Sequence, residues 1–131
     1  MRQLQGFTLL ELLVVLALIG LLSSLAVPGF QGMQQRSQRA LAKVALLKAA
    51  HWLERSASTQ GSYPSALPDA IWQSPELRYR LQLQSQAEAF VLKAIPTGAQ
   101  SSDACATLTL NQAGERGVLG ATLTAGACWG K

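Results

Sequence analysis

The stretch Gly6-Phe7-Thr8-Leu9-Leu10-Glu11 stands directly before an apolar run that extends to Val27. From Phe7 to Val27 the chain contains no Lys, Arg, Asp or His, and Glu11 is its one acidic residue. At a rise of about 1.5 Å per residue, a helix over this run measures about 30 Å, which is enough to cross a bilayer. A carboxylate inside such a segment costs about 2.5–3.5 kcal/mol, so we expect Glu11 to have a function.

These residues resemble the class III signal of type IV pilins and pseudopilins, in which Gly-Phe-Thr-Leu-x-Glu begins a hydrophobic helix. Here Leu10 takes the variable position. The resemblance implies a leader, Met1–Gly6, which a prepilin peptidase removes by cutting between Gly6 and Phe7 on the cytoplasmic side. It also implies that the new amino group of Phe7 is methylated.

Glu11 lies four residues after Phe7 and is assigned by the resemblance to subunit assembly. When subunits pack, its carboxylate would meet the N-terminal amine of a neighbour. An unpaired charge in apolar surroundings is costly, whereas a paired one is much less so. This difference would favour assembly and set the register of the subunits.

Two alternatives for the N-terminus remain open. An ordinary secretory signal also begins with a basic residue, here Arg2, and Ser24-Leu25-Ala26 could serve as its cleavage site. The apolar run exceeds the usual length of such a signal, and it carries an acid near its start. A plain membrane anchor explains the run but neither Gly6-Phe7 nor Glu11.

The position of Arg2 before the apolar run agrees with the positive-inside rule, so the rest of the chain is expected to cross outward. For a pilin this implies a single-pass protein of the inner membrane with its head in the periplasm of a Gram-negative bacterium, and later a place in the extracellular pilus. The implied partners are other pilin subunits, the prepilin peptidase and the inner-membrane assembly platform.

The 131 residues predict one small head behind an anchor. We expect a leader at 1–6, a helix at 7–58 that spans the membrane at 7–27, and a globular head at 59–131. Pro28 should kink or locally break the helix, because proline removes a backbone donor. By family analogy the helix would melt locally there when a subunit enters a filament.

The helix beyond Met33 is apolar on two sides. Leu41 lies roughly opposite Leu46 and Leu53, which predicts that one side meets the sheet of the head and the other meets neighbouring subunits. A group of cations on one side is expected to be a solvated face: Arg36, Arg39 and Lys43.

After a loop at 61–75 the chain favours strands. Residues 77–83 alternate strictly, with one face formed by Leu77, Tyr79, Leu81 and Leu83 and the other by Arg78, Arg80 and Gln82. Further strands are expected at 90–95, 106–110 and, more weakly, 118–124. Short connections predict an antiparallel meander, with Leu108 and Leu110 facing the helix. The fold class is therefore α+β, a long N-terminal helix packed on a small antiparallel sheet, as in the type IV pilin fold.

The C-terminal segment carries a second resemblance. Residues 105–117, closing with Cys128-Trp129, are similar to the C-terminal half of minor pilins related to PilE and to the competence pilin ComP, although Ala106 stands where that group commonly has Gly. Cys105 and Cys128 are the two cysteines of the chain, and in an exported protein they predict a disulfide. Two free thiols are the alternative. Closure of this loop would stabilise a small head by about 3–3.5 kcal/mol.

The sequence contains no pattern of residues that is typical of a catalytic site. His51 is the one histidine of the chain, so neither a catalytic pairing nor a metal site is expected. The glycines at 114, 117 and 120 are expected to serve turns, because no Gly-Lys-Ser/Thr follows them. We therefore expect a protein that is not an enzyme and that needs no cofactor.

The main hypothesis is a structural minor subunit of a type IV pilus, assembled through its N-terminal helix. A major pilin and a type II secretion pseudopilin are alternatives of the same class. The alternative of a different class is a DNA-binding competence pilin that acts as a receptor for DNA uptake. Its support is the ComP-like ending, a net charge of +4 that becomes +3 without the leader, and outward-facing cations: Arg78, Arg80 and Lys93.

Overall fold

The structure is a computed structural model that describes residues 6–72 and 77–130. Apart from Gly6, the expected leader lies outside the described residues, as does the end of the expected loop at 73–75. The chain divides into two compact units, one up to Gln34 and one from Gln35. The elements are, in chain order, α1 (Leu9–Gln60), α2 (Asp69–Trp72), β1 (Tyr79–Ser85), β2 (Phe90–Pro96), η1 (Gly98–Ser102), β3 (Thr107–Asn111), β4 (Arg116–Leu119) and α3 (Ala125–Trp129).

Helix α1 does not end at Pro28, which lies inside it. The local break expected from the sequence is therefore absent in the single chain. Pro28 still lacks the N–H that would donate to the carbonyl oxygen of Ser24, so one backbone hydrogen bond of the helix is missing there. The helical hydrogen bonds on either side hold the turn together. Melting of this turn on assembly stays a prediction.

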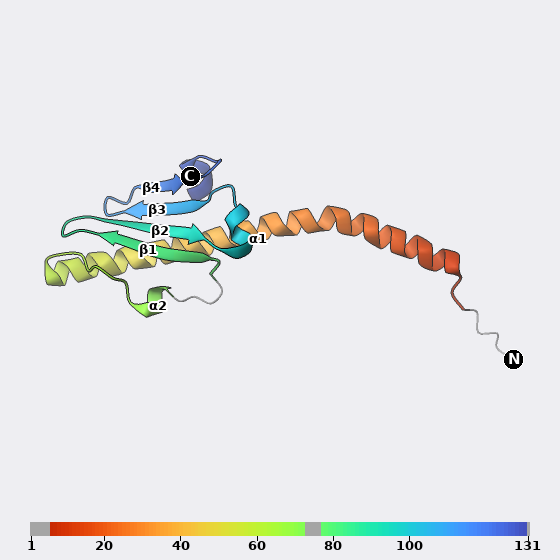
Figure 1. Cartoon of the computed structure of the whole chain (residues 1–131), viewed down its shortest axis with the longest axis horizontal. Helices are drawn as coiled ribbons and strands as arrows, with labels where there is room; N and C mark the ends of the chain where they lie inside the picture. The colour runs from red at the N-terminus through yellow and green to blue at the C-terminus, as the bar shows by residue number, and fades with distance from the viewer. Residues whose placement is uncertain (1–5, 73–76, 131) are drawn as a thin grey trace. The chain divides into compact units, whose positions relative to one another are not determined.

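The head is built on one face of the second half of α1. Its buried residues follow the helical spacing of four, three and four, and they are Ala42, Leu46, Ala49 and Leu53. The two alanines allow the sheet to approach the helix closely, while the two leucines fill the space between the layers. Figure 1 shows this part of α1 lying along the sheet. The core therefore forms mainly between this helix and the sheet, and it extends to Leu67, the disulfide and Trp129.

The sheet has the order β1-β2-β3-β4, and every neighbouring pair is antiparallel. One row of paired residues faces α1 and is apolar: Leu81, Ala94, Leu108 and Val118. The adjacent row faces away and is mainly polar: Gln82, Lys93, Thr109 and Gly117. The predicted α+β fold, its antiparallel meander and the inward direction of Leu108 are confirmed.

The fourth strand is shorter and earlier than expected. Pairing ends at Leu119, because Gly120 turns the chain with a φ of 69°. The segment expected to continue the strand instead reaches Thr124, whose hydroxyl accepts a hydrogen bond from the N–H of Ala127 and caps α3. Helix α3 was not expected from the sequence, and neither was α2 within the loop that follows α1.

The expected disulfide is present between Cys105 and Cys128, and both residues are buried. It joins the turn before β3 to α3, so the last segment of the chain is tied to the sheet. Trp129 beside it is also buried, and its Nε1–H donates to the carbonyl oxygen of Gly117 at 2.9 Å. The bridge and this hydrogen bond together fix α3 against β4.

We predict that Ala106→Gly stabilises the head. Ala106 adopts a φ of 44°, where a Cβ costs about 1–2 kcal/mol, and glycine loses about 0.5–1 kcal/mol of that gain through its greater freedom when unfolded. Urea unfolding of the full chain in detergent, followed by near-ultraviolet circular dichroism, should show a gain of about 0.5–1 kcal/mol. Ala104→Gly is the control and should destabilise. A loss of stability in Ala106→Gly would contradict the prediction.

Candidate functional site

The N-terminal segment begins with three residues outside the helix: Gly6, Phe7 and Thr8. The hydroxyl of Thr8 accepts a hydrogen bond from the backbone N–H of Glu11 at 3.2 Å, and the Thr8 carbonyl accepts from Leu12 N–H. Thr8 is therefore the N-cap of α1, and Glu11 occupies the third helical position. This role of Thr8 was missed in the sequence, although Thr-x-x-Glu before an apolar run is the pattern of a capping box.

Glu11 stands on the first turn of an exposed apolar surface. Its neighbours Phe7 and Leu10 are 79% and 73% exposed, and large apolar side chains remain exposed as far as Met33. Within the described residues, Glu11 forms no ion pair. Helix α1 is long and apolar enough to cross a membrane by length and composition, and its most apolar segment is not buried.

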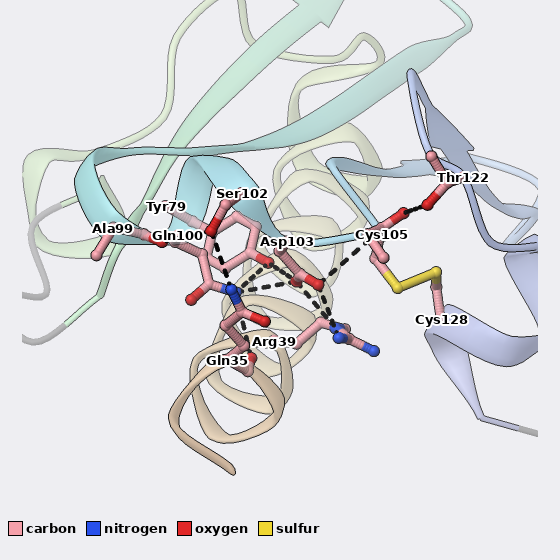
Figure 2. Close-up of polar contacts among 11 residues, drawn as sticks. Gln35, Arg39, Tyr79, Ala99, Gln100, Ser102, Asp103, Cys105, Thr122 and Cys128 are labelled. Atoms are coloured by element: carbon pink, nitrogen blue, oxygen red, sulfur yellow. Dashed lines mark hydrogen bonds and ion pairs between the residues drawn. A yellow bond between two sulfur atoms is a disulfide. The ribbon is translucent and has the colours of Figure 1, made fainter. Parts of the chain in front are cut away.

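The head contains a buried carboxylate that accepts five hydrogen bonds. Asp103 receives two from the guanidinium of Arg39, at 2.7 and 3.0 Å, and one from the hydroxyl of Tyr79 at 2.9 Å. The side-chain amide of Gln100 donates at 2.9 Å, and the backbone N–H of Cys105 donates at 3.3 Å. Figure 2 shows these groups converging from α1, β1 and the segment before β3.

Burial and these bonds together set the ionisation of Asp103 and Tyr79. Burial alone would raise the pKa of Asp103, but hydrogen bonds from Arg39, Tyr79 and Cys105 hold that pKa below its ordinary value. Burial raises the pKa of Tyr79 to about 12, and its bond to Asp103 adds to the rise, while the bond from Gln100 opposes it. The carboxylate is therefore ionised and the phenol neutral at pH 7. The cluster ties α1 to the disulfide segment.

The expectation that Arg39 belongs to a solvated face with Arg36 and Lys43 is wrong for Arg39. Its side chain is 15% exposed and forms a bidentate ion pair with Asp103, whose side chain is 1% exposed. Arg36 is exposed as expected, and Lys43 is half-buried. Sequence reasoning could not find the pair, because 64 residues separate its partners.

Two of the three cations considered for DNA contact, Arg80 and Lys93, lie on the outward side of the sheet. Arg80 is exposed on β1, and Lys93 on β2 is half-buried and paired with Gln82, two residues from Arg80. Arg78 precedes β1 and is exposed, while its backbone N–H donates to the side-chain oxygen of Gln38. Side chains two residues apart share a face of a strand, so the structure places Arg80 and Lys93 as neighbours, whereas Arg78 lies outside the paired strand.

A further cation lies near the C-terminal segment. The guanidinium of Arg116 lies 5.5 Å from the ring centroid of Trp129, within reach of a cation–π contact.

Among the described residues, no group of three or more His, Cys, Asp and Glu side chains is arranged to hold a metal ion.

Residues 28–109 match the family model described as "Type IV minor pilin ComP, DNA uptake sequence receptor". This match covers more than half of the chain. The chain belongs to this family of type IV minor pilins.

The rest of the pilin agrees with this assignment. Residues 1–27 match the prokaryotic N-terminal methylation motif, which contains Gly6, Phe7 and Glu11. The pilin is thus of a kind that is anchored in a membrane before assembly.

Two solved structures resemble the pilin. A type IV pilin from Shewanella oneidensis is 35% identical, with 69% of this chain and 96% of that chain covered and a TM-score of 0.55. The non-core minor pilin PilV from Neisseria meningitidis is 20% identical, with coverages of 70% and 92% and a TM-score of 0.56, and it supports the fold alone. No curated protein matches the chain significantly.

We predict that acid destabilises the pilin head through Asp103. Because the folded-state pKa of this carboxyl lies below its unfolded value, the stability that it contributes is present above the unfolded pKa and is lost as pH falls through the folded pKa. Urea unfolding of the full chain in detergent should therefore show a steeper loss of stability below about pH 4 in the wild type than in Asp103→Asn.

At pH 7, Asp103→Asn should be destabilised by about 3 kcal/mol, because it leaves the Arg39 charge poorly paired. The double variant Arg39→Met with Asp103→Asn is the control: it removes the unpaired charge while the new amide keeps an acceptor for Tyr79, Gln100 and Cys105, so it should recover part of that loss. Equal acid slopes in the wild type and Asp103→Asn would contradict the assignment.

Proposed function

We propose that this minor pilin is a structural subunit that enters a type IV pilus through α1. In this proposal a prepilin peptidase cuts between Gly6 and Phe7, and Phe7 is then methylated. Residues 7–27 hold the protein in the inner membrane of a Gram-negative bacterium, with the head in the periplasm, until the assembly platform adds it to other pilin subunits. The extracellular fibre is its final location.

The observation that carries the proposal is the contrast between Glu11 and its surroundings. Glu11 is an acid without an ion-pair partner among residues 6–72 and 77–130. It stands in an exposed apolar segment, which only water or lipid surrounds in an isolated subunit. Burying that segment in a bundle of helices offsets the cost of the acid if a cation arrives with it. The free amine of a processed neighbour supplies such a cation.

The cap at Thr8 supports processing at the proposed bond. Because α1 starts at Leu9, the peptide bond between Gly6 and Phe7 lies outside the hydrogen-bonded helix. A peptidase can therefore bind it without first unwinding a helical turn.

Glu11→Val should remain in the membrane but appear in sheared fibres at less than about a tenth of the wild-type amount, because the paired charge in the fibre is lost. Mass spectrometry of the membrane fraction first establishes that both proteins start at a methylated Phe7. Quantification in purified, sheared pili then gives the result. Glu88→Val, which removes an exposed carboxylate between β1 and β2, is the matched control and should assemble normally.

Wild-type levels of Glu11→Val in the fibres would contradict the role of Glu11. A mature N-terminus near Val27 would instead contradict pilin-type processing as a whole.

A second candidate function, supported by a separate observation, is DNA binding. The matched family is described as a DNA uptake sequence receptor, and this chain presents Arg80 and Lys93 on the side of the sheet that faces away from α1, with Arg78 exposed just before β1. The polar neighbours Gln82 and Thr109 flank Lys93 and can donate hydrogen bonds to phosphate. Three cations form a small footprint, so we infer weak contact that does not depend on base sequence.

The triple variant Arg78→Ala, Arg80→Ala and Lys93→Ala should bind duplex DNA more weakly than the wild type. The dependence of log affinity on log salt concentration should flatten by about 2–3 units, because each neutralised phosphate contributes about 0.9. Fluorescence anisotropy of labelled duplex DNA with the full chain in neutral nanodiscs measures the affinity and its dependence on salt. The control is Arg36→Ala, Lys48→Ala and Arg55→Ala, which removes the same charge from α1 and should retain the slope.

Two results would change this assignment. Equal slopes in the two triple variants would contradict binding at the sheet. Sub-micromolar affinity at physiological salt, lost in the sheet variant, would make the receptor role the principal function.

A further inference from the structure

One face of α1 in the head carries apolar and basic side chains that the described residues leave exposed. It lies opposite the buried line of Ala42 and Leu46, and we call it the outer helix face. Its members are Leu41, Val44, Leu47, Lys48, His51 and Arg55, all of them exposed. The three apolar side chains are 43%, 48% and 39% exposed, which is unusual for adjacent residues at helical spacing on a soluble head.

The outer helix face is basic as well as apolar. Lys48 and Arg55 lie on it, and Glu54 is the one acid between residues 40 and 56. Glu54 lies to one side and accepts a hydrogen bond from the hydroxyl of Tyr63 at 2.9 Å. At the edge of the face, burial lowers the pKa of Lys43, and the positive charges of Arg39 and Arg116 lower it further. The surroundings therefore hold an excess of positive charge.

A hollow of about 420 Å³ runs beside this face towards α2. Its lining combines the apolar Val44 and Leu47, the basic Lys48 and Arg55, and Trp52. Aliphatic and tryptophan side chains interleaved with Lys and Arg are the composition of a helix that lies on a membrane surface.

The position of this face in the chain brings it close to lipid. Residue 41 follows residue 27 by 14 residues, which is about 21 Å of helix, so an anchored head stays near the bilayer at a high effective concentration. Pro28, which lacks a backbone donor, lies in the connecting segment and lowers the cost of bending there.

We propose that, before assembly, the outer helix face docks on the anionic surface of the same membrane that holds the N-terminal half of α1. Leu41, Val44 and Leu47 enter the headgroup layer, while Lys48 and Arg55 contact lipid phosphates. The proposal rests on the proposed function in one respect, the membrane anchor. A second copy fits this face less well, because two such faces would bring basic side chains together without an acid.

The test uses the full chain in vesicles and a spin label at Ala40→Cys. Ala40 is exposed on the same side of α1, and both native cysteines are held in the disulfide, so the new thiol is labelled alone. Vesicles of phosphatidylcholine with about one third phosphatidylglycerol are compared with phosphatidylcholine alone. Relaxation by oxygen and by a water-soluble nickel complex reports whether the label is in lipid or in water. A label at Gln84→Cys, exposed on the opposite layer, is the position control.

We expect the ratio of oxygen to nickel accessibility at position 40 to rise at least about threefold in the anionic vesicles and to fall again in high salt, with no change at position 84. Lys48→Gln with Arg55→Gln should abolish the rise. Arg78→Gln with Arg80→Gln removes the same charge from the sheet and should leave the rise intact.

The proposal would be overturned if the label at position 40 stayed in water in anionic vesicles, or if its accessibility ratio were equal in both kinds of vesicle. Protection that grows with the ratio of protein to lipid would also overturn it, because a second copy would then cover the face. Failure of the protein to remain in the vesicles after carbonate extraction would contradict the membrane anchor of the proposed function instead.

Discussion

The packing of one line of α1 against the inner face of the sheet is the contact on which the rest of the head depends. Ala42, Leu46, Ala49 and Leu53 form a continuous core with the apolar row of the four strands. Because this line occupies only one face of the helix, every other face of α1 must meet something else. This contact fixes the rotation of α1 about its own axis. That rotation then determines where the cations, the exposed aliphatic side chains and Arg39 lie.

The ion pair of Arg39 and Asp103 adds specificity to this core. A well-packed apolar pair could be equally stable, but five hydrogen bonds to one carboxylate allow only one arrangement of the helix, β1 and the segment before β3. Asp103 stands two residues before Cys105, so the same bonds also position the disulfide. The C-terminal segment is therefore tied to α1 through side chains as well as through sulfur.

One helix serves two environments. Its first part exposes apolar residues, as a membrane-anchored pilin requires, and its second part supports the head. The basic and apolar outer face belongs to neither role completely. Membrane docking before assembly would keep its aliphatic side chains from water, and assembly would then compete for the same surface. The proposed DNA contact uses the opposite layer of the head, so the two activities do not compete for one surface.

The sequence by itself determined the features that depend on neighbouring residues. The motif from Gly6 to Glu11 identified the family, and alternation in residues 77–83 assigned the inward and outward faces of β1, because both patterns are local. Tertiary structure alone decided the place of α3 and the partner of Arg39, whereas the end of β4 follows from the local turn at Gly120. For α3 and Arg39 a contact between distant segments was decisive, the disulfide to Cys128 and the bond from Arg39 to Asp103, and no local pattern records such a contact.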